Sequence, residues 1–429
     1  MKRAALLLLV AAGLAGGWWF LDGRGGGHGV AEDPGGGWVL GLPGSFAVRP
    51  APRAPEGLGG IGYATGTAPP ALRTGVVRSV EELEPGLTLL CHGNAAAAEL
   101  VDERGEVVHR WALPYAELPD APPLEGDHQI PWRAVELLEN GDLIAIHSGR
   151  AMVRVRADSS LVWARYERFH HDVIARSGGV GLALARTERI VEEVQGEAPI
   201  VDDLLVEFDL ATGEPLRSLS LWEALAASPF AELFARLTVR EGDVMHANGL
   251  ALLDAAFCAS LAAPGVEAGD VLVSMRDLDL VVAVDLDAGR ATWVTSGPGT
   301  SRWRGLHDPT PWVDGDGAPH LLVFDNLGGP GGTSRLLDLR LEDESIAWSY
   351  EGTPPGAFDS LFCGTVERLP GGHILTAESM AGRVLIIDPG SRRVLWEYAS
   401  PHLAGRGDRY VAAVFEAHRV TGPLDWLER

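Results

Sequence analysis

Cysteine is scarce in this sequence, and the few present form no familiar metal or redox motif. Only Cys91, Cys258 and Cys363 occur among 429 residues, far apart and without a CxxC pair. An odd number of cysteines cannot pair completely, so at most one disulfide forms, and buried free thiols are the simpler expectation.

Positively charged residues are also few, which argues against nucleic acids as partners. Lysine and arginine total 35 against 59 acidic residues, for a formal net charge of −24. A surface this acidic repels phosphate backbones, so we expect no nucleic-acid binding. An anionic substrate would need a local basic pocket within that field.

The N-terminal segment has the pattern of an export signal. Lys2 and Arg3 precede an apolar run from Ala4 to Leu21, and a charged region followed by an apolar one directs export. The run lies near the lower limit of about 17 residues for a membrane span. No cysteine follows it, which excludes a lipoprotein. We therefore interpret residues 1–22 as a signal peptide or membrane anchor, and expect the mature chain to be periplasmic, anchored to an inner membrane.

Residues 23–75 are rich in glycine and proline with little periodicity, which favours a flexible tether. The remainder, residues 76–429, contains a loosely recurring unit in which a short apolar strand ends on a polar side chain. Six segments show it: Leu87–His92, Gly141–His147, Gly181–Arg186, Asp270–Arg276, His320–Asp325 and His373–Glu378.

A second strand with an acidic turn, and often a tryptophan, follows each copy. Trp111, Trp163, Trp293, Trp348 and Trp396 occupy this place. Short alternating strands at a period of roughly 40 to 60 residues predict four-stranded blades, and hence an all-β, six-bladed β-propeller. One helical insert is expected at Leu221–Leu237, and the final strand, Val411–Val420, is expected to complete the first blade and close the ring.

Polar residues recur at two repeat positions that a propeller brings to one mouth of its central channel. The start of the first strand carries His171, His246 and His307, and the end of the second carries Arg186, Arg276 and Asn326 in the same three blades. In an antiparallel pair these two positions share an edge. We therefore expect a cationic, hydrogen-bonding cup.

Such a cup suits a tetrahedral oxyanion, because arginine offers a planar fork and histidine can donate, accept or attack. A metal site is the rival use of three histidines. No HxH or HExxH spacing supports it, and an arginine beside the cluster would repel a cation. We therefore expect no metal in the cup.

At these residues the sequence resembles the bacterial arylsulfotransferase family, the type that does not use a nucleotide sulfate donor. The matching segments occur in family order over about residues 80–420: His170–Val173, His246–Asn248, Ser274–Arg276, His307–Asp308, Phe324–Asn326, Ser334–Arg335, Gly382–Val384 and Leu395–Glu397. Each is weak alone, and together they are fairly specific.

The resemblance implies a six-bladed propeller, secretion, no cofactor, and transfer of a sulfuryl group from an aryl sulfate to a phenol through a histidine. It assigns the nucleophile to His307 and assisting roles to His171, His246 and Arg276. We expect Arg186, Asn248 and Asn326 to contact substrate.

Several features depart from the family pattern or leave alternatives open. Classical members have an N-terminal β domain used in dimerisation. In this sequence the expected tether, residues 23–75, occupies that place, so a homodimer stays an open question. The stretch Asp254–Ala268 is additional, and Leu306 replaces a common glutamine before His307. Two other functions remain: a non-catalytic propeller that binds an anionic ligand or partner protein, and a quinone-dependent dehydrogenase.

Overall fold

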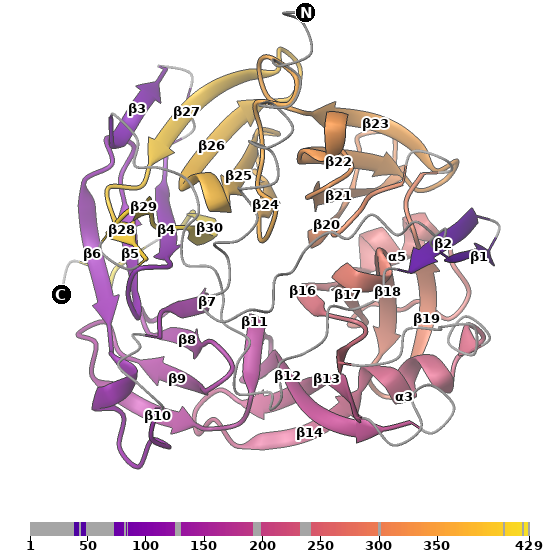
Figure 1. Ribbon diagram of the computed structural model, residues 1–429, viewed down its shortest axis with the longest axis horizontal. Coiled ribbons are helices and arrows are strands. Elements are labelled where there is room, and N and C mark those ends of the chain that lie inside the picture. Colours follow the sequence, from indigo (N-terminus) through magenta and orange to yellow (C-terminus); the bar gives the residue numbers. More distant parts are fainter. Residues whose placement is uncertain are drawn as a thin grey trace, which may run out of the picture.

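The computed structural model describes residues 38–42, 44–48, 73–80, 83, 85–124, 130–191, 199–231, 242–298, 302–405, 408–422 and 424–427. Its strands form six sheets of four or five strands around a central axis (Figure 1), and this confirms the predicted all-β, six-bladed propeller. The predicted signal or anchor at residues 1–22 lies outside the described residues. Among those described, no helix is long and apolar enough to span a membrane.

Each blade is an antiparallel sheet whose first strand lies nearest the axis. Blade 1 contains β30 (Val414–Val420), β4 (Leu87–His92), β5 (Ala97–Val101) and β6 (Val107–Ala112). Blade 2 contains β7 (Trp132–Leu137), β8 (Leu143–His147), β9 (Ala151–Val155) and β10 (Leu161–Arg165). Blade 3 contains β11 (Phe169–Arg176), β12 (Val180–Ile190), β13 (Pro199–Asp209) and β14 (Pro215–Ser220), with β15 (Gly242–Asp243) parallel to β13.

The remaining blades repeat the pattern. Blade 4 contains β16 (Ala247–Leu252), β17 (Val271–Met275), β18 (Leu280–Asp285) and β19 (Arg290–Thr295). Blade 5 contains β20 (His307–Val313), β21 (Pro319–Asp325), β22 (Arg335–Arg340) and β23 (Ser345–Tyr350). Blade 6 contains β24 (Thr365–Arg368), β25 (Ile374–Glu378), β26 (Arg383–Asp388), β27 (Arg393–Ala399) and the outermost strand β3 (Gly75–Ser79). The six segments predicted from the repeat are the second strands of the six blades.

The ring is closed from both ends of the chain. As predicted, the C-terminal strand β30 pairs with β4 and completes blade 1. In addition, β3, which precedes blade 1 in the chain, pairs with β27 at the outside of blade 6. Two small hairpins stand apart from the blades: β1 (Trp38–Leu42) with β2 (Gly44–Val48), inside the stretch expected to be a tether, and β28 (Leu403–Ala404) with β29 (Tyr410–Val411).

The helical content differs in detail from the single predicted insert. Helix α3 (Leu221–Ala226) begins where expected, with Ser220 accepting a capping bond from the Glu223 amide, and residues 232–237 of the predicted insert lie outside the described residues. Another helix in the described part of the chain, α5 (Ala255–Leu261), has Asp254 as its cap residue and lies within the stretch noted as additional. Short 3-10 turns occur at Tyr115–Glu117, Arg276–Leu278, Pro330–Gly332 and Ser379–Ala381.

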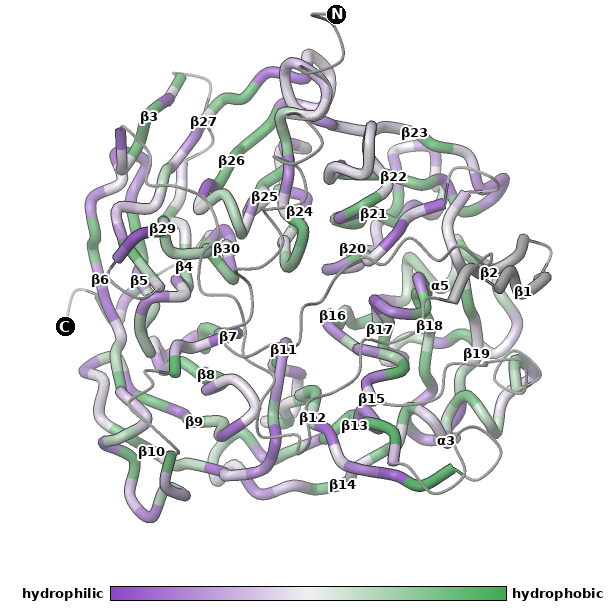
Figure 2. The backbone as a smooth tube through the Cα atoms, viewed as in Figure 1, coloured by the Kyte–Doolittle hydropathy of each residue, from purple (hydrophilic) through white to green (hydrophobic). Residues whose placement is uncertain are grey.

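The hydrophobic core lies between the blades. Each of six apolar clusters joins the facing surfaces of two neighbouring sheets, for example Leu182 and Leu184 of blade 3 with Val271 and Val273 of blade 4. Because both faces of a middle strand are buried, strands such as β18 are apolar almost throughout, rather than alternating (Figure 2).

The recurring tryptophans link one blade to the next. The indole N–H groups of the outer strands donate to carbonyl oxygens of the following blade: Trp111 to Gly141 at 3.0 Å, Trp163 to Leu210 at 3.0 Å, Trp348 to Pro389 at 3.0 Å and Trp396 to Glu103 at 2.9 Å. The tryptophan that marks the repeat in the sequence therefore holds the ring together.

Candidate active site

A pocket lies where the innermost strands of all six blades meet. In five of these strands the pairing with the second strand is interrupted by a bulge at the same level. A bulge bends a strand and re-aims its side chains. The residues at these interruptions, together with Gly364 before β24, line the pocket: Arg133, Asp172, Asn248, Asp308 and Phe415. The pocket therefore lies on the propeller axis, where the hydrophilic ends of β11, β16 and β20 are seen in Figure 2.

His307 lines this pocket and is held as one tautomer. Its Nδ1 lies 2.7 Å from Oδ1 of Asn326 and 3.2 Å from the Gly305 carbonyl oxygen, and both are acceptors, so Nδ1 carries the proton. Burial, followed by the charges of Arg276 and Arg133, lowers the pKa of His307 well below its usual value. The ring is therefore neutral, with the lone pair on Nε2.

Asn326 fixes this arrangement through its own amide. Its Nδ2 donates to the carbonyl oxygens of Ser360 (2.6 Å) and Cys363 (2.7 Å), so Oδ1 must face His307. The side chain is completely buried. Contact between Asn326 and substrate stays a prediction; in the structure its Oδ1 accepts from His307 and orients that ring.

His246 is the histidine of this group with a raised pKa. It precedes β16, and its Nδ1 lies 2.8 Å from Oδ2 of Asp243. Burial opposes the charged form, but the charge and hydrogen bond of Asp243 outweigh it and raise the pKa of His246. In turn, although burial favours the acid form, the charge of His246 lowers the pKa of Asp243 to about 2. This pair can donate and accept a proton.

His171 lies between His246 and a second histidine. Its ring contacts that of His246 edge-on, with 4.9 Å between centroids, and its Nδ1 is 2.7 Å from Nδ1 of His170. On the far side, Nε2 of His170 is 3.3 Å from Asp203. Burial and then the charge of His246 lower the pKa of His171 well below its usual value. His171 is thus a neutral neighbour of the His246–Asp243 pair.

Each arginine near the pocket has a carboxylate beside it, so the cup is less cationic than its arginines alone suggest. Arg276 donates to Asp277 at 2.5 Å, and Arg133 lies 3.4 Å from Glu416. The charges of both arginines act on His307. Arg186, by contrast, acts on His170, Asp203 and Asp243. It therefore lies behind the histidines, next to the acids.

Asn248 lines the pocket but also joins two blades. Its Nδ2 donates to the Leu306 carbonyl oxygen at 3.0 Å, and its Oδ1 accepts from the Ser274 hydroxyl at 2.6 Å. The bond to Leu306 ties the strand of His246 to the strand of His307. Asn248 therefore sets the spacing of the two histidines.

The neighbouring innermost strands are tied together in the same way elsewhere. Carboxylates accept backbone N–H groups of the next blade: Glu136 from Ala175, Asp172 from Leu250, Asp308 from Val366 and Glu367 from Arg419, at 2.6 to 2.9 Å. Asp308, next to the proposed nucleophile in sequence, thus points to blade 6, and Asn326 orients the ring of His307.

The structure places His171 beside His246, and the charges of His246 and Arg276 act on His307, which alone of these four lines the pocket. The roles of the four residues stay predictions, and the structure adds two groups that the sequence analysis missed. Asp243 lies three residues before His246, and that short spacing was the available signal. Arg133 occupies the bulge of blade 2, between Trp132 and Ala134, where other blades carry Asp172, Asn248 and Asp308. Aligning the first strands at the bulge, instead of searching for histidine, would have found it.

Fold and pocket together define a six-bladed β-propeller with a neutral histidine in the pocket on its axis, and the charge of a histidine–aspartate pair acts on that histidine. Residues 135–399, which are more than half of the chain, match the family described as Arylsulfotransferase (ASST). The chain therefore belongs to the arylsulfotransferase family, and this supports a sulfotransferase-type function. No curated protein matches the sequence significantly.

Solved structures give only distant likenesses. A protein of unknown function from Bacteroides caccae has 12% identity over 73% of this chain and 94% of its own, with a TM-score of 0.43. A streptogramin B lyase has 10% identity over 78% of this chain and 84% of its own, with a TM-score of 0.40. BamB from Moraxella catarrhalis has 10% identity over 76% of this chain and 77% of its own, with a TM-score of 0.32.

Proposed function

We propose that this protein transfers a sulfuryl group from an aryl sulfate to a phenolic acceptor through a sulfohistidine at Nε2 of His307. The observation that carries the proposal is the fixed tautomer of His307, whose Nδ1 is committed to Asn326 and Gly305. A neutral imidazole attacks through its lone pair and later leaves, so it divides one difficult transfer into two easier ones.

In the first half-reaction Nε2 of His307 attacks sulfur, and the bond between sulfur and the aryl oxygen breaks. The departing phenolate takes a proton from His246, whose raised pKa supports the charged form. In the second half, an incoming phenol returns a proton to His246, its oxygen attacks sulfur, and the N–S bond breaks. His307 and His246 are then restored.

The two arginines that act on His307 would bind the sulfuryl oxygens. Negative charge on these oxygens rearranges in the transition state, and preorganised donors stabilise it most when water is excluded. Arg276 offers a fork only partly used by Asp277, and Arg133 approaches from blade 2. No bound metal or organic cofactor takes part in this scheme.

Mass spectrometry after addition of donor alone tests the mechanism. The peptide containing His307 should gain one sulfuryl group, about 80 Da, and lose it when phenol is added. His307→Gln should abolish the adduct and turnover, whereas the matched change His320→Gln in the same blade should preserve both. An adduct on His171 or His246 would reassign the nucleophile, and turnover by His307→Gln would exclude the mechanism.

We further propose that the reaction takes place outside the cytoplasm, because Lys2, Arg3 and the apolar run Ala4–Leu21 have the pattern of an export signal. A reporter active only after export, fused at Arg429, should be active and associated with the inner membrane. Activity of a reporter that works only in the cytoplasm would contradict the proposal.

A further inference from the structure

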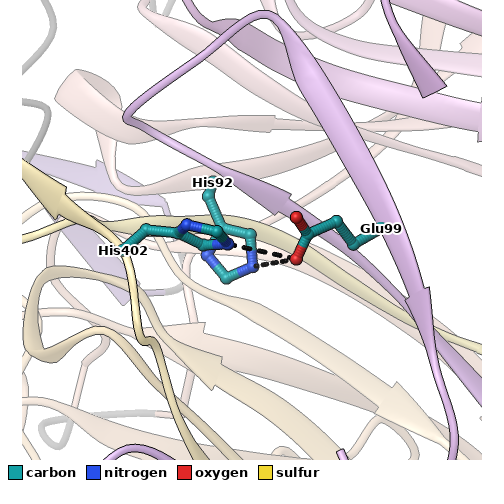
Figure 3. Close-up of side chains that lie close together, drawn as sticks. All are labelled: His92, Glu99 and His402. Carbon is teal, nitrogen blue, oxygen red and sulfur yellow. Dashed lines mark hydrogen bonds and ion pairs between the residues drawn. The ribbon is translucent and has the colours of Figure 1, made fainter. Parts of the chain in front are cut away.

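A cluster of two histidines and one glutamate lies away from the active-site pocket, at the seam where the ring closes. His92 ends β4 and Glu99 lies in β5, both in blade 1, while His402 follows β27 of blade 6. Figure 3 shows the three side chains converging. Among the described residues, they are the one group of at least three such side chains whose ligand atoms lie within 4.8 Å of one another.

The distances are close to those of a metal centre. Oε2 of Glu99 is 3.1 Å from Nε2 of His402 and 3.9 Å from Nε2 of His92. Ligands of a tetrahedral zinc ion, at about 2.0 to 2.1 Å from the metal, lie about 3.3 Å from one another. The two measured separations bracket that value, so small side-chain shifts would complete the geometry.

An unsatisfied buried nitrogen gives independent support for a ligand at this place. His92 is 3% exposed, and within the described part of the chain its Nε2 has no hydrogen-bond partner. Its distance of 3.9 Å from Glu99 is too long for a hydrogen bond. A buried polar atom without a partner is costly, and a cation between the two side chains would give Nε2 of His92 a partner.

The remaining contacts prepare the three side chains as ligands. Nδ1 of His92 lies 3.2 Å from the Ser400 hydroxyl, which orients the ring. Arg110 lies 3.5 Å from Oε1 of Glu99, so Oε2 is the oxygen turned to the histidines. His402 is half-buried, and its exposed side offers a way in from solvent.

We propose that His92, Glu99 and His402 bind a divalent transition-metal ion of the Zn²⁺ type, with a water molecule as the fourth ligand. Two imidazoles and a carboxylate are ligands that zinc accepts. The ion would join the segment that leaves blade 6 to two strands of blade 1, shortly before the chain enters β30. It would therefore fasten the closure of the propeller and is independent of sulfuryl transfer.

The test uses the full chain, freed of metal by a chelator and then titrated with Zn²⁺ against a chromophoric competitor. The wild type should bind one ion per chain, and Zn²⁺ should raise its melting temperature. Co²⁺ should give the visible absorption of a four-coordinate site. His402→Gln and Glu99→Gln should each weaken binding by at least about 10-fold, since even loss of a group that only orients a metal ligand has an effect of this size.

The matched control is His373→Gln, which removes a histidine just before β25 and should leave affinity and thermal shift unchanged. Far-ultraviolet circular dichroism identifies any variant that fails to fold. Absence of a stoichiometric Zn²⁺ site and of the Co²⁺ spectrum in the wild type would overturn the proposal. Retention of wild-type affinity by both His402→Gln and Glu99→Gln would also overturn it.

Discussion

At the level of single residues, the central question is how neighbouring histidines in and beside the pocket have different protonation states. His307 is kept neutral by burial and by Arg276 and Arg133, whereas Asp243 raises the pKa of His246. Groups whose environments move their pKa values apart are typical of sites in which one acts as nucleophile and the other as acid and base. This division of roles follows from which carboxylate or amide each ring contacts.

Arg276 should be sensitive even to a change that keeps its charge. Arg276→Lys removes the planar fork that would hold two sulfuryl oxygens, and we expect turnover to fall about 100-fold or more, the scale of losing one such donor. Steady-state assay with a chromogenic aryl sulfate and an added phenol measures this. Arg340→Lys, in β22, is the control and should retain activity. Near-normal turnover of Arg276→Lys would remove this residue from the site.

The pH profile should report the His246–Asp243 pair. Since protonated His246 serves the leaving phenolate, kcat/KM should fall as pH rises through the raised pKa of His246. Asp243→Asn removes the charge that raises this pKa, so the basic limb should move to lower pH by about one unit or more. Donors with weakly basic leaving groups should show the smallest effect.

Asp287→Asn, which changes an exposed aspartate of blade 4, is the control for this profile and should leave the limb in place. An unchanged basic limb in Asp243→Asn would show that another group supplies the proton.

At the level of strands, the propeller depends on bonds that pass from blade to blade. Outer strands are joined by tryptophan indoles and innermost strands by carboxylates that accept backbone N–H groups. The bulges that open the pocket lie on these innermost strands, so the same carboxylates also set the distances between the side chains that line the pocket. The geometry of the pocket and the closure of the ring therefore depend on the same hydrogen bonds.

A substitution of Trp396 should show how much one indole hydrogen bond between blades contributes to the free energy of unfolding. Trp396→Phe keeps an aromatic ring between blades 6 and 1 but loses the bond to the Glu103 carbonyl oxygen, which is left without its partner. We expect a loss of about 2 kcal/mol in the free energy of unfolding, from the unmet hydrogen bond and the smaller ring. Denaturant titration followed by circular dichroism measures it.

Trp293→Phe is the matched control, because the described residues show no indole hydrogen bond for the equivalent tryptophan of blade 4. Equal losses in the two variants would mean that ring packing alone, and not the inter-blade bond, is responsible.

For the whole molecule, the concentration of buried acids along the axis makes stability depend on pH. Burial raises the pKa of Asp172, Glu136, Glu367 and Asp308, the last to about 7. A folded-state pKa above the unfolded value of 3.8 means that folded Asp308 binds more protons than the unfolded chain. Its contribution to stability is therefore lost as pH rises from about 4 to about 7.

Asp308→Asn should remove this dependence while keeping an acceptor for the Val366 amide. The difference in free energy of unfolding, variant minus wild type, should rise between pH 5 and pH 8 by on the order of 2 kcal/mol. This figure allows for partial solvation of the Asp308 carboxylate in the pocket, which lowers the effect of burial. Thermal or denaturant unfolding at both pH values measures the difference. Asp343→Asn, at an exposed turn, should track the wild type, and a constant offset for Asp308→Asn would contradict the expectation.

Sequence reasoning went furthest where a signal repeats along the chain. Strand ends and tryptophans recur in each blade, so the six-bladed fold, its second strands and the closing strand β30 could all be predicted. The convergence of His171, His246, His307 and Arg276 followed from the same repeat, since equivalent positions of a propeller meet at its axis. Helix α5 was missed because seven residues with one capping aspartate give little periodic signal.

What the sequence by itself determined is the repeat, and with it the set of side chains that reach the axis. Only the tertiary structure decided their chemical states, because these depend on contacts between segments that no local pattern relates. The Nδ1 proton of His307 is fixed by Asn326, which follows β21, and the bulge brings Arg133 in from blade 2. His92 and His402 are 310 residues apart by their numbering, and they meet solely because the ring closes between blades 6 and 1.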